Sequence, residues 1–108
     1  MFDITVDHLF EVYKQLEGRS DLVMTTTSVL NTEVHDEFTI DCPIIVCKAH
    51  DKILYLYVYE EMFILDVMDN TRTKGTHWHP YNVEYAIYDI EEFMNGKADY
   101  EMQPFIQG

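Results

Sequence analysis

The residues best suited to chemistry lie at positions 72–82, in the segment RTKGTHWHPYN. His77 and His79 are two positions apart, so on an extended backbone their side chains point the same way and can share a metal ion. Zinc needs a third or fourth ligand, and no Cys or carboxylate stands at a suitable spacing, so we predict no metal and no cofactor. Arg72 and Lys74 form the only basic cluster of the sequence. With the N–H groups of a following helix start, they suggest an alternative site for an anion or small ligand.

A structural role explains the same segment equally well. In that interpretation Trp78 closes an edge of the core while the two flanking histidines form local hydrogen bonds. The sequence has no G-x-S-x-G elbow, no Gly-rich phosphate loop and no H-E-x-x-H motif. Ser20 and Ser28 have no histidine at a spacing that signals catalysis. We therefore predict no catalytic residue and a protein that is not an enzyme.

Three tyrosines alternate with aliphatic residues in the stretch ILYLYVYEEMFILDV, at positions 53–67. Alternation places them on one face of a strand and the aliphatic residues on the other. A strand that buries one face does not need three tyrosines on the opposite face, so we predict a second apolar face that contacts a partner. The predicted partner-binding residues are Lys48, Tyr55, Tyr57, Tyr59, Ile64 and Asp66.

Tight turns centred at positions 51–52 and 60–61 set the expected register of three strands, 44–50, 53–59 and 62–68. The residues that then share the buried face are Leu54, Leu56 and Val58, opposite Val67, Leu65 and Phe63 on one side and Ala49, Cys47 and Ile45 on the other. On the opposite face, this register predicts a polar row of Lys48, Tyr55 and Asp66.

Two helices flank these strands. Residues 4–17 have apolar side chains at helical spacing, with Asp3 or Thr5 as a cap, and a second helix is expected to begin near Pro80 and to end at Gly96. The expected fold is α+β: an antiparallel sheet of four to five strands with an N-terminal and a C-terminal helix packed on one face. This arrangement leaves the tyrosine face uncovered. Two alternatives stay open: one helix covers each face, or the N-terminal strands fold over the tyrosines.

Those N-terminal strands are predicted at 22–30 and 37–41, with a bend or sheet edge at Pro43. The 108 residues fit a single domain, 1–108, in which 97–108 form a tail prone to fraying. Cys42 and Cys47 match no metal or redox spacing and are expected to be buried, reduced thiols.

Charge restricts the choice of partner. The chain has 20 acidic against 7 basic residues and a net charge of −13, which disfavours nucleic acid and anionic membranes and favours a basic protein. Acidity that serves only solubility is an open alternative. No apolar run approaches the roughly 18 residues of a membrane span, and the start has no basic n-region, so a cytoplasmic location is expected.

The segment GTHWHPYNVEYAIYDIEEFMNG, with Thr-His-Trp-His-Pro before an acidic helix and a glycine, resembles the C-terminal element of small acidic bacterial proteins. Some of these are grouped with immunity proteins of polymorphic toxin systems. The resemblance covers residues 76–96, and it implies a cytoplasmic protein that neutralises a toxin domain; it transfers no catalytic residue.

Three hypotheses follow from these observations. The first is a non-enzymatic acidic binding module with a basic, toxin-like partner. The second is a homodimer of unknown structural role that buries the tyrosine face. The third is a small anion- or metal-binding protein that uses residues 72–79.

Overall fold

In the computed structural model, the described residues are 3–18, 22–30, 38–71, 74–96 and 103–104, with backbone alone described at 25–30, 38–42 and 103–104. The predicted α+β class with an N-terminal and a C-terminal helix is confirmed. In chain order the elements are α1 (Val6–Leu16), β1 (Leu22–Leu30), β2 (Phe38–Ala49), β3 (Lys52–Tyr59), β4 (Met62–Asp69), β5 (Lys74–Trp78), α2 (Val83–Met94) and β6 (Gln103–Pro104).

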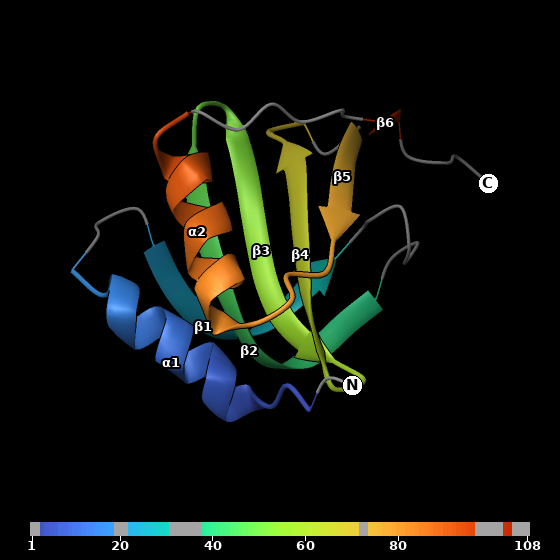
Figure 1. The fold of residues 1–108 in the computed structure, drawn as a ribbon. Coiled ribbons are helices and arrows are strands. Elements are labelled where there is room, and N and C mark those ends of the chain that lie inside the picture. Colours follow the sequence, from blue (N-terminus) through green and yellow to red (C-terminus); the bar gives the residue numbers. More distant parts are fainter. Residues whose placement is uncertain (1–2, 19–21, 31–37, 72–73, 97–102, 105–108) are drawn as a thin grey trace.

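All the strands belong to one antiparallel sheet whose spatial order, β1-β2-β3-β4-β5-β6, follows the chain. Both helices lie on the same face of this sheet (Figure 1). They bury Leu9 of α1 and Ile90 of α2 against Leu54 and Leu56 of β3. Cys47 is buried in this helix-side core, as predicted, whereas the side chain of Cys42 lies outside the described residues. The predicted tail also lies largely outside them, except for Gln103–Pro104, which pair with the start of β5.

Local signals explain the ends of both helices. Thr5 precedes α1, and its backbone N–H donates to Nδ1 of His8 at 2.9 Å. The second helix begins later than predicted: Pro80 lies before it, and Asn82 is the N-cap, with its Oδ1 accepting from the N–H of Tyr85 at 2.9 Å. Gly96 follows the helix with φ of 68°. A Cβ there would approach the His50 ring to 3.1 Å, so any other residue would have to displace this ring slightly as well as adopt a φ that L side chains rarely adopt.

Two-residue turns connect the central strands. His50 and Asp51 join β2 to β3, and Glu60 and Glu61 join β3 to β4. All four residues have φ between 51° and 64°, as type I′ turns require, because this twist matches that of the flanking strands. The predicted β3–β4 register is confirmed, with Leu56 opposite Leu65.

The predicted β2–β3 register is wrong by two residues. Leu54 lies opposite Cys47, and Lys48 lies opposite Ile53 and not Tyr55. The reason is the turn, which is centred one residue earlier than expected. A shift of two residues keeps every side chain on its predicted face, so the residues predicted to form the apolar face still lie on one face of the sheet. In place of the predicted row, the apolar Val46 lies opposite Tyr55, and Asp66 lies between Tyr55 and His77.

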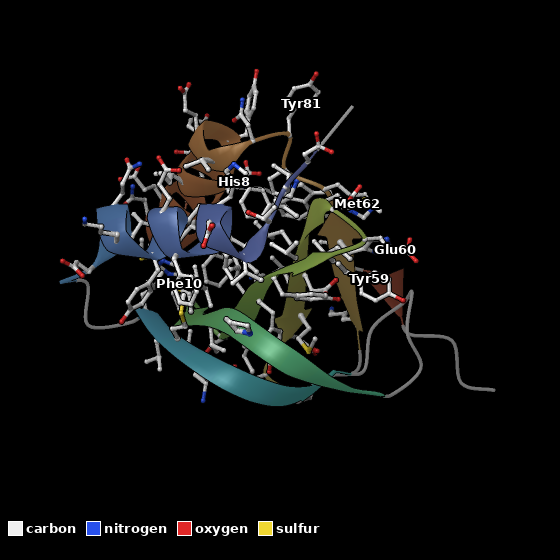
Figure 2. All side chains as sticks on the ribbon, turned by 90° about the horizontal axis from the view of Figure 1, so that it is seen from below. His8, Phe10, Tyr59, Glu60, Met62 and Tyr81 are labelled. Atoms are coloured by element: carbon white, nitrogen blue, oxygen red, sulfur yellow. The ribbon has the colours of Figure 1, made fainter. Side chains whose placement is uncertain are left out.

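The β1–β2 hairpin explains what happens to the second face. The strands predicted at 37–41 and 44–50 correspond to a single strand, β2 (Phe38–Ala49), which runs through Pro43. Between the pairs Thr25–Ile44 and Thr27–Asp41, β2 has one residue more than β1, which defines a bulge. A bulge bends its strand and increases its twist. The outer half of the hairpin accordingly passes behind β3 and β4, on the face away from the helices (Figures 1 and 2).

Candidate functional site

The tyrosine face predicted to bind a partner is largely buried inside the single chain. Tyr57 is 0% exposed and Tyr55 3% exposed, and both belong to a second apolar cluster with Ile64 and Met68. The expectation of an uncovered face is therefore wrong here, because the sheet curves and the β1–β2 hairpin lies behind it. Of the six predicted contact residues, only Tyr59, which is 43% exposed beside the β3–β4 turn, and Lys48 are exposed.

Asp66 is the charged residue of this second cluster and is 2% exposed. The hydroxyl of Tyr57 donates to its Oδ2 at 3.2 Å, while Tyr55 and His77 lie opposite it on the neighbouring strands. Burial raises the pKa of Asp66 from 3.8 to about 7, and the hydrogen bond from Tyr57 opposes that rise. Asp66 is thus buried within the single chain, where its charged form is disfavoured.

The histidines of the predicted ligand site do lie together. The rings of His77 and His79 are 6.0 Å apart in an edge-to-face arrangement. Nδ1 of His79 lies 3.1 Å from the carbonyl oxygen of Phe63, to which its N–H can donate. Within the described part of the chain, no group of three or more His, Cys, Asp or Glu side chains is placed to hold a metal ion.

The basic residues of that predicted site are separated from the helix start. Lys74 begins β5 and its backbone N–H donates to Oδ1 of Asp69 at 3.2 Å, whereas α2 starts beyond the other end of β5 (Figure 1). Asn82 already accepts from the N–H of Tyr85 at that start. Arg72 lies outside the described residues. The structure therefore does not bring Lys74 and the N-terminus of α2 into one anion site.

Trp78 has a specific partner that the sequence did not reveal. Its indole Nε1 donates to Oδ2 of Asp89 at 2.9 Å, which joins the end of β5 to α2. Desolvation raises the pKa of Asp89 above its ordinary value of 3.8, the bond from Trp78 lowers it, and the nearby charge of Glu92 raises it further. Asp89 is half-buried and is held in position by this bond.

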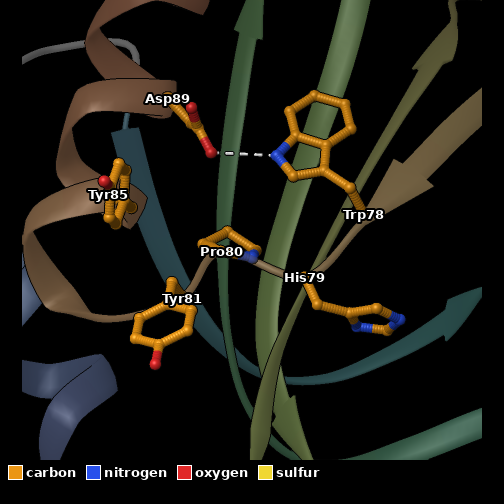
Figure 3. A pocket seen from close by; sticks show the side chains of 6 residues that line it. All are labelled: Trp78, His79, Pro80, Tyr81, Tyr85 and Asp89. Carbon is orange, nitrogen blue, oxygen red and sulfur yellow. Dashed lines mark hydrogen bonds between the residues drawn. The ribbon is translucent and has the colours of Figure 1, made fainter.

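A groove opens between the end of β5 and α2. It has a volume of about 440 Å³. We call it the α2 groove, and it is lined by Trp78, His79, Pro80, Tyr81, Tyr85 and Asp89. Figure 3 shows Tyr85 and Trp78 on opposite sides of Pro80, with Asp89 at one end and Tyr81 at the other. The groove is thus aromatic, with one carboxylate.

Three tyrosines stand exposed at this end of α2: Tyr81, Tyr85 and Tyr88, at 60%, 57% and 59%. We call them the α2 tyrosine surface. The rings of Tyr81 and Tyr85 meet edge-to-face with centroids 6.4 Å apart. A second hollow of about 520 Å³, lined by Asn82, Glu84, Tyr85 and Tyr88, adjoins the groove at Tyr85. Large aromatic rings that water reaches are typical of protein contact surfaces.

The sequence contained a signal for this surface. Positions 81, 85 and 88 have the spacing of one helix face, opposite the apolar stripe that packs on the sheet. The surroundings of this surface are also acidic: residues 75–96 include four Asp or Glu and no Lys or Arg. An aromatic surface in an acidic setting is suited to a basic partner.

No family model matches the chain, and no curated protein or solved structure matches it either.

None of the helices in the described part of the chain is long and apolar enough to cross a membrane.

Proposed function

We propose that this chain is a non-enzymatic, acidic binding module that takes a basic protein partner on the α2 tyrosine surface. The observation that carries the proposal is the exposure of Tyr81, Tyr85 and Tyr88 together on one surface, at 57–60%, which is higher than that of the other exposed aromatics in the described part of the chain, Phe10 and Tyr59. The net charge of −13 supports a basic partner, because opposite charge speeds encounter and tyrosine supplies apolar area with little conformational entropy.

Within this class we propose an immunity-type protein that neutralises a toxin domain by covering it. The segment at 76–96, on which the resemblance to immunity proteins rests, includes Trp78, the α2 tyrosine surface and the α2 groove. This overlap supports the proposal, because the resemblance lies in the sequence whereas the exposure of the tyrosines is a property of the fold.

The test begins with affinity isolation of partners and continues with titration calorimetry on each purified candidate. The expected partner is basic, binds with 1:1 stoichiometry and loses at least about tenfold in affinity with the Tyr85→Ala/Tyr88→Ala variant. Tyr59→Ala is the matched control, because Tyr59 is also exposed but lies beside the β3–β4 turn, whereas Tyr81 lies on the helix side (Figure 2). An acidic partner, or equal affinity for both variants, would contradict the proposed surface.

The immunity role has its own readout. A partner that is a toxic enzyme should lose its activity when one equivalent of this chain is added, and co-expression should restore growth to cells that produce it. If the partner keeps its full enzymatic activity in the complex, this chain is a binding module but does not neutralise the partner.

A homodimer is the second candidate, and the outer edge of β1 favours it. β1 is the edge strand of the sheet, and its sequence LVMTTTSVL has nine residues without a charge or a proline. Such an edge can pair with another strand, because its backbone N–H and C=O groups face outward. Light scattering at tens of micromolar distinguishes the candidates: a dimer that Val23→Lys dissociates supports β1 pairing, and a strict monomer opposes it.

A further inference from the structure

We infer that the α2 groove receives an arginine side chain from the basic partner, with the guanidinium stacked on the aromatic rings and paired with Asp89. This inference rests on the proposed function for its source of arginine, but the groove can be tested alone. Three features of the groove support it: its aromatic rings, its carboxylate and, among the described residues, the absence of a Lys or Arg paired with that carboxylate.

The ring faces come from Trp78, Tyr81 and Tyr85. Aromatic faces carry negative electrostatic potential and attract cations, most strongly in the case of tryptophan. Arginine suits such walls better than lysine, because its planar guanidinium stacks on rings while its edges still donate hydrogen bonds. Tyr85 and Trp78 lie on opposite sides of Pro80, so aromatic rings border the groove on two sides (Figure 3).

The carboxylate of Asp89 lies at one end of this space. Its Oδ2 accepts from Trp78, and a carboxylate has acceptor positions on both oxygens, so Oδ1 is left to receive a second donor. Among the described residues, no Lys or Arg pairs with Asp89, and residues 75–96 contain neither type. The carboxylate is therefore held in place and half-buried, with no Lys or Arg paired to it among the residues that the structure describes.

Charge also decides between the occupants of the groove. A second copy of this chain would bring another −13 and, from the equivalent surface, further carboxylates. A basic partner brings the opposite charge to Asp89, Glu84 and Glu92. The volume of about 440 Å³ is ample for one long side chain and falls in the range of small-ligand pockets.

The experiment uses Trp78 as its probe, because it is the only tryptophan of the chain and it lines the groove. The protein is titrated with acetyl-Gly-Arg-Gly-amide and, separately, with the same peptide carrying citrulline, a neutral group of nearly the same shape. We expect a saturable change in Trp78 emission with the arginine peptide and none with the citrulline peptide.

Two variants make the assignment specific. Asp89→Asn removes the charge but keeps an oxygen that can accept from Trp78, and we expect it to weaken binding of the arginine peptide at least about tenfold. Asp51→Asn is the matched control, since it removes the same charge from the exposed β2–β3 turn, and it should leave binding unchanged.

Three results would overturn the inference: an equal response to citrulline, equal weakening by Asp89→Asn and Asp51→Asn, or Trp78 emission that changes with protein concentration alone as a dimer forms. The inference and the proposed function can fail separately. If a basic protein binds through Tyr85 and Tyr88 and its affinity is unchanged by Asp89→Asn, the inferred arginine site is wrong and the proposed function stands. Specific binding of the arginine peptide without any protein partner removes the function alone.

Discussion

The indole N–H of Trp78 donates to the carboxylate of Asp89 across 2.9 Å and so ties the end of β5 to α2. These residues are eleven positions apart, and the loop between them contains Pro80 and Tyr81. One hydrogen bond therefore fixes both the aromatic wall and the charge of the α2 groove. The bond should therefore stabilise both the groove and the contact between β5 and α2.

Removal of either partner should destabilise the protein, and the two losses should not add. We expect Trp78→Phe and Asp89→Ala each to lower the free energy of unfolding by about 1–2 kcal/mol, and the double variant to show a coupling of about 1 kcal/mol. These values are measured by urea unfolding monitored by far-ultraviolet circular dichroism, because Trp78→Phe removes the only tryptophan on which a fluorescence measurement would depend. Strictly additive losses would mean that the bond contributes nothing to stability.

The buried Asp66 makes stability depend on pH. Its pKa is raised from 3.8 to about 7, so between these values the folded protein retains a proton that the unfolded chain has lost. The free energy of unfolding should therefore fall as the pH rises from about 4 to about 7, by a few kcal/mol at most. Asp66→Asn, which is neutral throughout, should remove this dependence and be more stable than the natural protein at pH 8.

The measurement is urea unfolding at pH 5, 6, 7 and 8 for both proteins, since the difference between them isolates Asp66 from the other acidic groups. Tyr57 donates to Asp66, and Tyr55 and His77 lie opposite it, so none of these is changed in the comparison. Parallel pH profiles for the two proteins would show that Asp66 ionises normally.

Much of this sheet could be predicted from alternation alone. The period of two fixes which side chains share a face, so Leu54, Leu56 and Leu65 were placed together correctly even where the turn was misplaced. Alternation does not fix the centre of a turn, because moving the centre by one residue shifts the register by two and leaves every side chain on the same face. No Gly marks the positive-φ positions of either turn, so the prediction agreed with the structure at Glu60–Glu61 and differed by one residue at His50–Asp51.

What covers the second face could not be predicted in the same way. It depends on a bulge near Pro43 that increases strand twist, and the angle of the resulting curve is a property of the whole sheet. The exposed tyrosines are a different case. Their spacing at 81, 85 and 88 places them on one helix face, but spacing alone does not show that this face is left uncovered by the rest of the chain.

Substitutions in the Glu60–Glu61 turn should increase the stability of the protein. Both residues have φ above 50°, a region that side chains with a Cβ disfavour, and two like charges stand side by side there. We expect Glu60→Asn/Glu61→Gly to raise the free energy of unfolding by about 1–2 kcal/mol, because Asn-Gly is the preferred type I′ pair. The backbone bond from the N–H of Ile4 to the carbonyl of Glu61, at 3.1 Å, remains available in the variant.

Glu60→Ala/Glu61→Ala is the control for charge in that turn. It removes both carboxylates but keeps the Cβ atoms, so it should not give the same gain. Equal stabilisation by the two variants, measured as the shift in the urea midpoint, would assign the effect to charge repulsion and not to the backbone.

The two kinds of tyrosine should respond differently to truncation. Tyr57 is fully buried and Tyr85 is 57% exposed. We expect Tyr57→Ala to lower the free energy of unfolding by about 3–5 kcal/mol, and Tyr85→Ala to change it by no more than about 0.5 kcal/mol. Thermal unfolding monitored by circular dichroism compares them directly. A stable, folded Tyr57→Ala would restore the sheet face as a candidate docking surface.

Arginine binding in the α2 groove should depend on pH through Asp89. Desolvation holds the pKa of this carboxyl above its ordinary value, so it takes up a proton at a higher pH than an exposed aspartate does. Because only the carboxylate pairs with a guanidinium, affinity for the arginine peptide should be constant at high pH and fall as the pH drops through that raised pKa. Titrations of Trp78 emission at successive pH values give the profile, and the residual binding of Asp89→Asn should lack it. Since a bound guanidinium stabilises the ionised carboxyl, saturating peptide should also move the midpoint of the profile to lower pH. An unchanged midpoint at saturating peptide would mean that the guanidinium binds away from Asp89.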